Sequence, residues 1–112
     1  MKKIVILACL QANDVCAGVS CLDALEERRA HFAQYGQERV KLCAFFRCSR
    51  CGVEPEEDSG TLEKLERLVS SGVETAHVGV CARKRDGTWC PQMVKTAAWM
   101  ENHGIRIEWG TH

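Results

Sequence analysis

Short, continuous apolar runs alternate along the chain with segments whose apolar residues recur at helical spacing. The first run, residues 4–7, reads Ile-Val-Ile-Leu, and such a run is typical of a strand that is covered on both faces. Residues 40–46, 75–80 and 105–109 form three further runs of this kind. The pattern therefore predicts four buried strands.

Helical spacing fills the three gaps between these strands. Ser20 and Asp23 resemble a capping box, and apolar positions then continue at helical spacing over residues 20–35. Residues 62–71 give a second helix, and Pro91 suits the first position of a third, over residues 91–103. A glycine follows each of these helices: Gly36, Gly72 and Gly104.

The resulting order of elements is β-α-β-α-β-α-β, with no Pro-rich or low-complexity linker along residues 1–112. We expect a single domain of the α/β class in three layers, Rossmann-like or flavodoxin-like, with a four-stranded parallel sheet flanked by helices. Such folds bind their ligands beyond the carboxyl ends of the strands. That edge of the sheet is where the chemistry is expected.

Eight cysteines among 112 residues need an explanation other than a disulfide framework. Hydrophobic residues make up 46% of the chain, enough for an ordinary core at this size. The apolar run after Met1 stops at Gln11, which is short for an export signal, and a buried strand explains it equally well. We therefore expect a cytoplasmic protein in which metal binding or thiol chemistry is favoured over structural disulfides.

Most of the cysteines fall where a predicted strand ends or the next helix begins. Cys9 follows the first strand, Cys48 and Cys51 the second, Cys81 the third, and His112 the fourth. The same loops and helix starts contain Cys16, Cys21 and Cys90. These eight residues are the candidate metal ligands, and we expect a subset of them to bind the metal. Tetrahedral zinc uses four ligands, so eight imply either two metal ions or one ion and a redox pair.

The segment Cys48-Ser49-Arg50-Cys51 is a Cys-x-x-Cys pair, which can bind one ion or close into a disulfide. An acidic segment, residues 54–58, separates the pair from the next helix, which favours a metal knuckle over a dithiol oxidoreductase. The positive charge of Arg50 is expected to lower the pKa of the Cys48 and Cys51 thiols. Cys21 and Cys90, near helix starts, are expected to face free backbone amides that stabilise thiolates.

The charge composition of the chain limits the classes of partner that it is expected to bind. Fifteen Lys and Arg residues balance fifteen Asp and Glu residues, and the only dense basic run is Arg83-Lys84-Arg85. This predicts neither a nucleic-acid nor a membrane partner, and leaves a metal ion and a small anionic molecule. The basic run, between Cys81 and Cys90, can offset the charge of a thiolate site or meet an anionic substrate, and a solvated loop explains it equally well.

Several of these motifs together resemble one known family. Cys16-Ala17-Gly18-Val19-Ser20-Cys21, the Cys48/Cys51 pair, Cys90-Pro91 and the ending Gly110-Thr111-His112 are similar in order and spacing to the CGGC domain family, over nearly the whole chain. The resemblance implies a metal-binding protein, with zinc as the suggested metal, and no established reaction. Ser49 and Arg50 replace the two central glycines of the family motif, which alters the turn and the amide hydrogen bonds available to sulfur.

Two other functions stay open beside metal binding. One is a thiol-disulfide enzyme in which Cys48 attacks and Cys51 or another thiol resolves. The other is an iron-sulfur protein, although the cysteine spacing matches neither common ferredoxin pattern. No carboxylate pair, Ser-His-Asp order, phosphate-binding loop or dinucleotide fingerprint indicates another reaction. Four residues are expected to pack or to lie on the surface rather than bind metal: Cys43, His31, His77 and His103.

Overall fold

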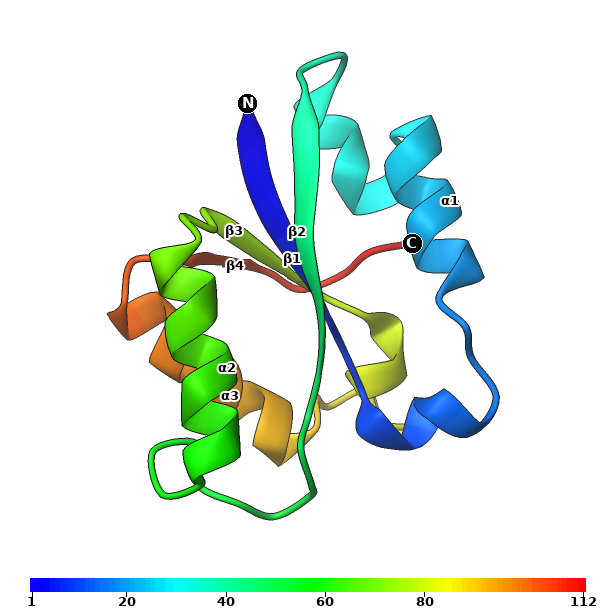
Figure 1. The fold of residues 1–112 in the computed structure, drawn as a ribbon. Helices are drawn as coiled ribbons and strands as arrows, with labels where there is room; N and C mark the ends of the chain where they lie inside the picture. The colour runs from blue at the N-terminus through cyan, green and yellow to red at the C-terminus, as the bar shows by residue number, and fades with distance from the viewer.

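The fold is a four-stranded parallel sheet, seen here in a computed structural model that describes residues 1–112 (Figure 1). Its strands are β1 (Lys2–Ala8), β2 (Val40–Arg47), β3 (Thr75–Val78) and β4 (Arg106–Glu108). They lie in the order β2-β1-β3-β4, and every neighbouring pair is parallel. This order corresponds to the first four strands of a flavodoxin-like sheet, so the predicted fold class is confirmed.

Helices cover both faces of the sheet. Figure 1 shows α2 (Ser59–Ser70) and α3 (Pro91–Asn102) on one face, and α1 (Val19–Glu27) on the other. Three short 3-10 helices complete the chain: η1 (Leu10–Asp14), η2 (Ala30–Tyr35) and η3 (Val80–Ala82). The predicted three layers are therefore present.

The central strand β1 supplies side chains to two separate cores. Val5 and Leu7 pack with residues of α2 and α3, whereas Ile4 and Ile6 pack with residues of α1 and η2. All four side chains are fully buried, and the alternation follows from the two-residue period of a strand. This explains the uninterrupted apolar run, because both faces of β1 are covered.

The sheet has a topological switch point at β1, the strand that pairs with β2 on one side and β3 on the other. The chain crosses from β1 to β2 through α1, and reaches β3 on the opposite side through α2. Ligand crevices in open parallel sheets form beyond the carboxyl ends of the two strands at such a point. Cys9 directly follows β1 and Cys81 lies in η3, just after β3, so both thiols stand at the switch point.

The predicted helix over residues 20–35 is wrong in its second half. It ends at Glu27, because Arg28 takes a left-handed conformation with φ of 55° and its guanidinium group donates a 2.6 Å hydrogen bond to the Leu25 carbonyl oxygen. The chain then continues as η2, which keeps the apolar face toward the sheet. The expected capping box is also absent, since Gly18 is the N-cap of α1 and no side chain caps it.

The other two helices begin and end close to the predicted positions. Asp58 caps α2 by accepting hydrogen bonds from the backbone N–H and the hydroxyl of Thr61, and Pro91 is the first residue of α3. Strand β3 is shorter than predicted, because the chain turns into η3 after Gly79. No helix combines the length and the apolar composition needed to cross a bilayer.

Candidate metal centre

The carboxyl edge of the sheet carries all eight predicted ligands, and we call these residues the thiol edge. Cys9 and Cys90 are the N-caps of η1 and α3, and Cys48 directly follows β2. The remaining members are Cys16, Cys21, Cys51, Cys81 and His112. Every cysteine of the chain is a free thiol, and Cys16, Cys51 and Cys81 are exposed.

Four cysteines of the thiol edge line one small cavity of about 20 Å³. These are Cys9, Cys16, Cys21 and Cys81, which we call the first thiol group; Ala8, Ala12, Phe45 and Arg47 complete the lining. A space of this size holds about one water molecule or one ion. The four thiols come from the ends of β1 and β3, from the loop before α1 and from α1 itself, so the switch point of the sheet assembles them.

Backbone amides contact two sulfurs of the first thiol group. The Cys9 N–H donates to Cys81 Sγ at 3.2 Å, and the Gly18 N–H donates to Cys16 Sγ at 3.3 Å. Burial of its sulfur raises the pKa of Cys81 although the residue as a whole is exposed, because Sγ faces the cavity. The amide of Cys9 partly offsets that rise in pKa, since a hydrogen bond to sulfur favours the thiolate.

The last residues of the chain, Gly110-Thr111-His112, pass over the first thiol group, and we call them the tail. Cys21 Sγ lies 3.3 Å from the Thr111 hydroxyl and 3.6 Å from His112 Nδ1. Thr111 is fully buried, so the tail here is fixed and His112 is held beside the cavity. A Cβ atom on Gly110 would lie 2.2 Å from His31 Nε2, and φ of +148° also favours glycine at this position.

A buried histidine anchors the tail to the sheet. His77 Nδ1 lies 3.2 Å from the Gly110 carbonyl oxygen, and Nε2 lies 2.6 Å from the Tyr35 hydroxyl. A carbonyl can only accept, so Nδ1 carries the proton and Nε2 accepts from the hydroxyl. Burial lowers the pKa of His77, which keeps the ring neutral. His77 is thus a core residue, as the sequence suggested, and its hydrogen bond positions the tail.

Cys48 and Cys90 lie on the other face of the sheet, and with Cys51, which lies near Cys48, we call them the second thiol group. Cys48 is buried in the core between the sheet and helices α2 and α3, and Cys90 packs against that core. Burial, together with the neighbouring thiols Cys90 and Cys9, raises the pKa of the Cys48 thiol to about 11. Cys9 therefore lies near both groups, because it also contacts Cys81.

Three electrostatic expectations for these thiols are wrong. Arg50 does not activate the Cys48/Cys51 pair, because its guanidinium group forms an ion pair with Asp58 at 3.1 Å. The expected contact of Cys90 with free amides is absent, since no side chain caps α3. Cys21 also turns away from the start of α1 and contacts the tail instead.

The sulfur and nitrogen atoms at this site are of the kinds that bind a thiophilic metal, but they lie farther apart than the ligands of one metal ion do. Thiolate sulfur and imidazole nitrogen are ligands that zinc prefers; four thiols line the cavity, and His112 Nδ1 lies 3.6 Å from one of them, Cys21 Sγ. In this arrangement no group of three or more His, Cys, Asp or Glu side chains is spaced to hold a metal ion. Metal binding therefore requires some of these thiols to turn inward, which a cysteine achieves through its single side-chain torsion.

Three residues of the site were given no individual role by the sequence analysis. Thr111 contacts Cys21, Arg47 lines the thiol cavity with its side chain over the Phe45 ring, and Gly110 leaves room for His31. The ending Gly-Thr-His was visible as a motif, but its role depends on the tail lying across α1. Cys43, in contrast, stays apart from the thiol edge on β2, where its Sγ lies 3.7 Å from the Lys41 carbonyl oxygen.

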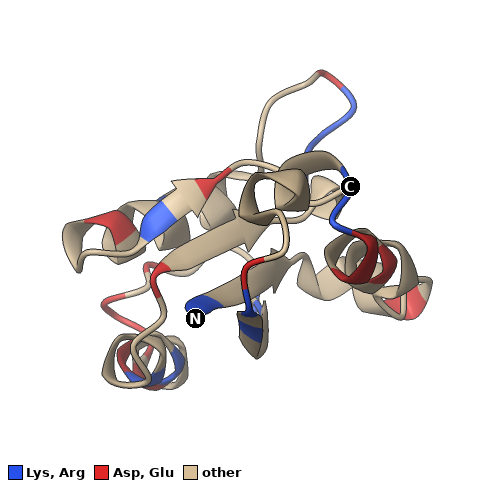
Figure 2. Ribbon diagram, turned by 90° about the horizontal axis from the view of Figure 1, so that it is seen from above, with Lys and Arg blue, Asp and Glu red and all other residues tan.

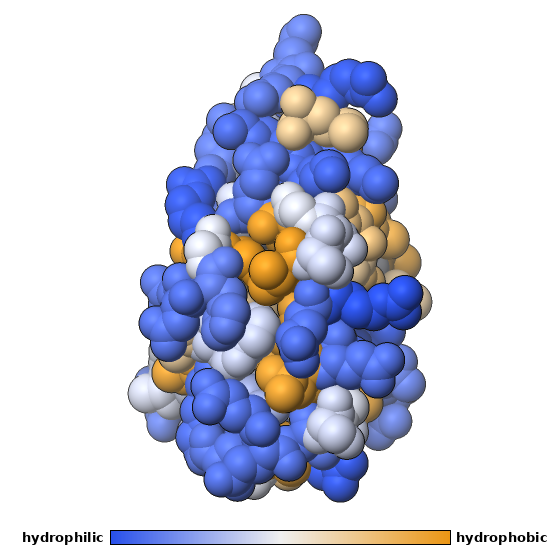
Figure 3. Space-filling view, turned by 60° about the vertical axis from the view of Figure 1, so that its left-hand side comes forward, coloured by the Kyte–Doolittle hydropathy of each residue, from blue (hydrophilic) through white to orange (hydrophobic).

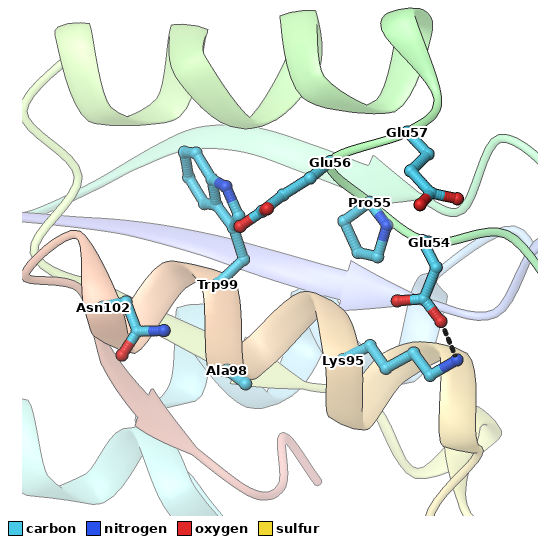
Figure 4. Close-up of a pocket in the computed structure, with 8 residues that line it drawn as sticks. All are labelled: Glu54, Pro55, Glu56, Glu57, Lys95, Ala98, Trp99 and Asn102. Carbon is cyan, nitrogen blue, oxygen red and sulfur yellow. Dashed lines mark hydrogen bonds and ion pairs between the residues drawn. The ribbon is translucent and has the colours of Figure 1, made fainter.

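Two wider hollows lie away from the thiols. One of about 400 Å³ separates residues 54–57 from α3, and it is lined by carboxylates, by the Lys95 ion pair to Glu54 and by Trp99 (Figure 4). The other, of about 590 Å³, lies between α2 and α3 on the side seen in Figure 3, where apolar residues gather within a largely hydrophilic surface. Neither contains a thiol.

Comparisons with known proteins give one match. The family model described as the CGGC domain matches residues 3–112. No curated protein and no solved structure matches the chain.

Proposed function

Because the chain belongs to the CGGC domain family, we propose that it is a metal-binding protein that holds zinc or a similar thiophilic ion at its thiol edge. The first thiol group is the proposed primary site. Cys9, Cys16, Cys21 and Cys81 would hold the ion as thiolates, with His112 as an alternative donor. A zinc ion bound by four protein ligands supplies a closed, redox-inactive link between loops.

One observation carries this proposal: four thiols line a single cavity of about 20 Å³ at the switch point of the sheet. A buried cysteine usually behaves as a small hydrophobe, but Cys16 and Cys81 are exposed residues, so packing does not explain why four thiols share one ion-sized space. Arg47, in the wall of the same cavity, supplies positive charge that offsets part of the negative charge of several thiolates. The amide hydrogen bonds to Cys81 and Cys16 act in the same direction.

The second thiol group is the proposed site of a second ion, which accounts for the surplus of ligands over four. Cys48, Cys51 and Cys90 are three donors, and the neighbouring Cys9 would be shared or would complete either set. The pKa of Cys48, about 11, means that metal must displace a tightly held proton there. We therefore propose weaker binding at this group than at the first.

The environment of Cys48 argues against the thiol-disulfide alternative. An attacking thiol works best with a pKa near the ambient pH, and a pKa of about 11 leaves roughly one thiol in ten thousand ionised at pH 7. Arg50 is paired with Asp58 and does not supply the missing activation. An iron-sulfur cluster would use the same four cysteines, and a colourless anaerobic preparation without iron would remove that alternative.

The test is zinc affinity of the reduced, metal-free protein, measured anaerobically by competition with a chromophoric chelator. Cys16→Ser removes an exposed donor of the first thiol group with little effect on the core. We expect zinc affinity to fall by more than about a hundredfold, since loss of second-shell contacts alone costs 10–100-fold.

Cys43→Ser is the matched control, because it removes a thiol that lies outside both groups. Its zinc affinity should equal that of the wild type. If the Cys16 and Cys43 variants bind zinc equally well, the first thiol group is not the metal site.

A further inference from the structure

Residues 83–89 form a short hairpin that the proposed metal site does not use, and we call it the arm. Arg83 and Trp89 pair as an antiparallel bridge, and the Lys84 N–H donates to the Thr88 carbonyl oxygen at 2.7 Å. Asp86 accepts hydrogen bonds from the backbone and hydroxyl of Thr88, which closes the turn. Figure 2 shows the arm projecting from the body of the protein with its basic residues along one side.

The arm is rooted in the thiol edge at both ends. Cys81 lies two residues before it, and Cys90 directly follows it. The Cys90 N–H donates to the Ala82 carbonyl oxygen at 2.8 Å, which holds the two ends of the arm together. Trp89 packs against Trp109, with ring centroids 5.0 Å apart, and so fixes the base of the arm to the end of the sheet. The arm thus keeps one orientation beside the thiols.

Three positive charges stand on this arm, and the carboxylate that acts on Lys84 is that of Asp86, whose pKa is lowered by hydrogen bonds from Thr88 and also by the charge of Lys84. Arg83, Lys84 and Arg85 are exposed, and none of them forms an ion pair. The one carboxylate of the arm, Asp86, is engaged by Thr88. Arg47 adds a fourth cation at the cavity itself. In a chain of net charge zero, the one dense basic run therefore lies between two thiols, Cys81 and Cys90.

We propose that the arm steers small, anionic metal complexes to the thiol edge, so that metal is delivered or removed by ligand exchange with carboxylate- or thiolate-bearing carriers. This inference rests on the proposed function. In the exchange, each metal–sulfur bond that forms releases one thiol proton to the solvent, and a bond between metal and carrier breaks. The ion keeps its charge, and no electrons are transferred.

Electrostatic steering explains why the charges belong on a projecting element. Fixed charges of one sign beside a site raise the association rate of oppositely charged ligands by 10- to 1,000-fold. The effect reaches only about 8 Å at physiological ionic strength, so the cations must stand close to the site that they serve. The base of the arm meets this requirement, because Arg83 is two residues from Cys81 and their Cα atoms are therefore at most about 7 Å apart.

The test compares two chelators that remove zinc from the loaded protein. EDTA is anionic and 1,10-phenanthroline is neutral, and the rate of zinc loss to each is measured by stopped flow at low and at high salt. In the variant Arg83→Gln/Lys84→Gln/Arg85→Gln, we expect zinc loss to EDTA at low salt to slow by about three- to tenfold. The rate with phenanthroline should not change, and 1 M salt should remove the difference.

The matched control removes three exposed cations from the opposite edge of the sheet: Lys2→Gln/Arg39→Gln/Lys41→Gln. It changes the net charge equally and should leave both rates unaltered. Arg83 also donates to the Gly87 carbonyl oxygen, so the double variant Lys84→Gln/Arg85→Gln provides a second test that keeps this contact.

Equal rates for the arm variants and the wild type with EDTA would overturn the inference while leaving the metal site intact. A wild-type protein that retains no zinc would contradict the proposed function and the inference together. An equal slowing with both chelators would also overturn it, because it would indicate a changed site rather than lost steering.

Discussion

Replacing Tyr35 by Phe tests how the tail is held over the thiols. The substitution removes one hydroxyl group and leaves the ring, which lies in the core with Ile4 and Ile6. That hydroxyl donates to His77 Nε2 over 2.6 Å, and both side chains are buried. In the variant, the Nε2 lone pair of the fully buried His77 loses its donor.

The expected cost follows from that unsatisfied nitrogen. Leaving a buried acceptor without a partner costs about 1–3 kcal/mol, and the full burial of His77 places this case near about 2 kcal/mol. For a chain of this size, such a loss lowers the melting temperature by roughly 8 °C. The urea m-value should not change, because the substitution leaves the surface exposed on unfolding unaltered.

Urea unfolding followed by circular dichroism measures this directly. A double-mutant cycle with His77→Asn gives a second test. In the His77→Asn background, Tyr35→Phe should lower the free energy of unfolding by less than it does in the wild type, because the Tyr35–His77 hydrogen bond has already been removed. A loss below about 0.5 kcal/mol in the single variant would show that Tyr35 and His77 do not depend on each other. The proposed anchoring of the tail would then be wrong.

Three further predictions concern the same region. Burial lowers the pKa of His77 in the folded protein, so as the pH falls the unfolded chain takes up this proton first. The free energy of unfolding should therefore fall as the pH drops below about 6.5. In urea titrations, His77→Asn should make this pH dependence flatter. Gly110→Ala should lower both the melting temperature and zinc affinity, and His31→Ala added to it should restore part of each, because the new Cβ would strike the His31 ring. Iodoacetamide at pH 8 should alkylate the exposed Cys51 well before the buried Cys48, because roughly one Cys48 thiol in a thousand is ionised at that pH. Peptide mass spectrometry measures both rates, and equal rates would contradict the burial of Cys48.

Local signals predicted most of the fold. The apolar run of β1 indicated a strand covered on both faces, and Pro91 marked the start of α3 within one residue. The break at Arg28 was missed because Phe32 and Tyr35 keep their helical spacing across it. A hydrophobic pattern does not reveal a residue other than glycine that adopts a left-handed conformation. The conformation of Arg28 is accompanied by a hydrogen bond from its own guanidinium group, which the pattern does not encode.

The position of the thiols along the chain predicted their common edge but not their division into two groups. Which group a cysteine joins depends on the face of the sheet on which it packs. Cys21 packs with Ile4 and Ile6 on the α1 side, and Cys48 packs with Val5 and Leu7 on the side of α2 and α3. This choice is set by the tertiary path of each loop, which spacing alone does not encode.

The most direct measurement is the metal content of the protein, by mass spectrometry, after anaerobic purification without an affinity tag or added metal. The account predicts zinc at one equivalent per chain, or two if the second thiol group is also filled, and loss of the first equivalent in Cys16→Ser but not in Cys43→Ser. A folded protein that contains no metal, and that does not take up zinc when it is supplied, would contradict the metal site.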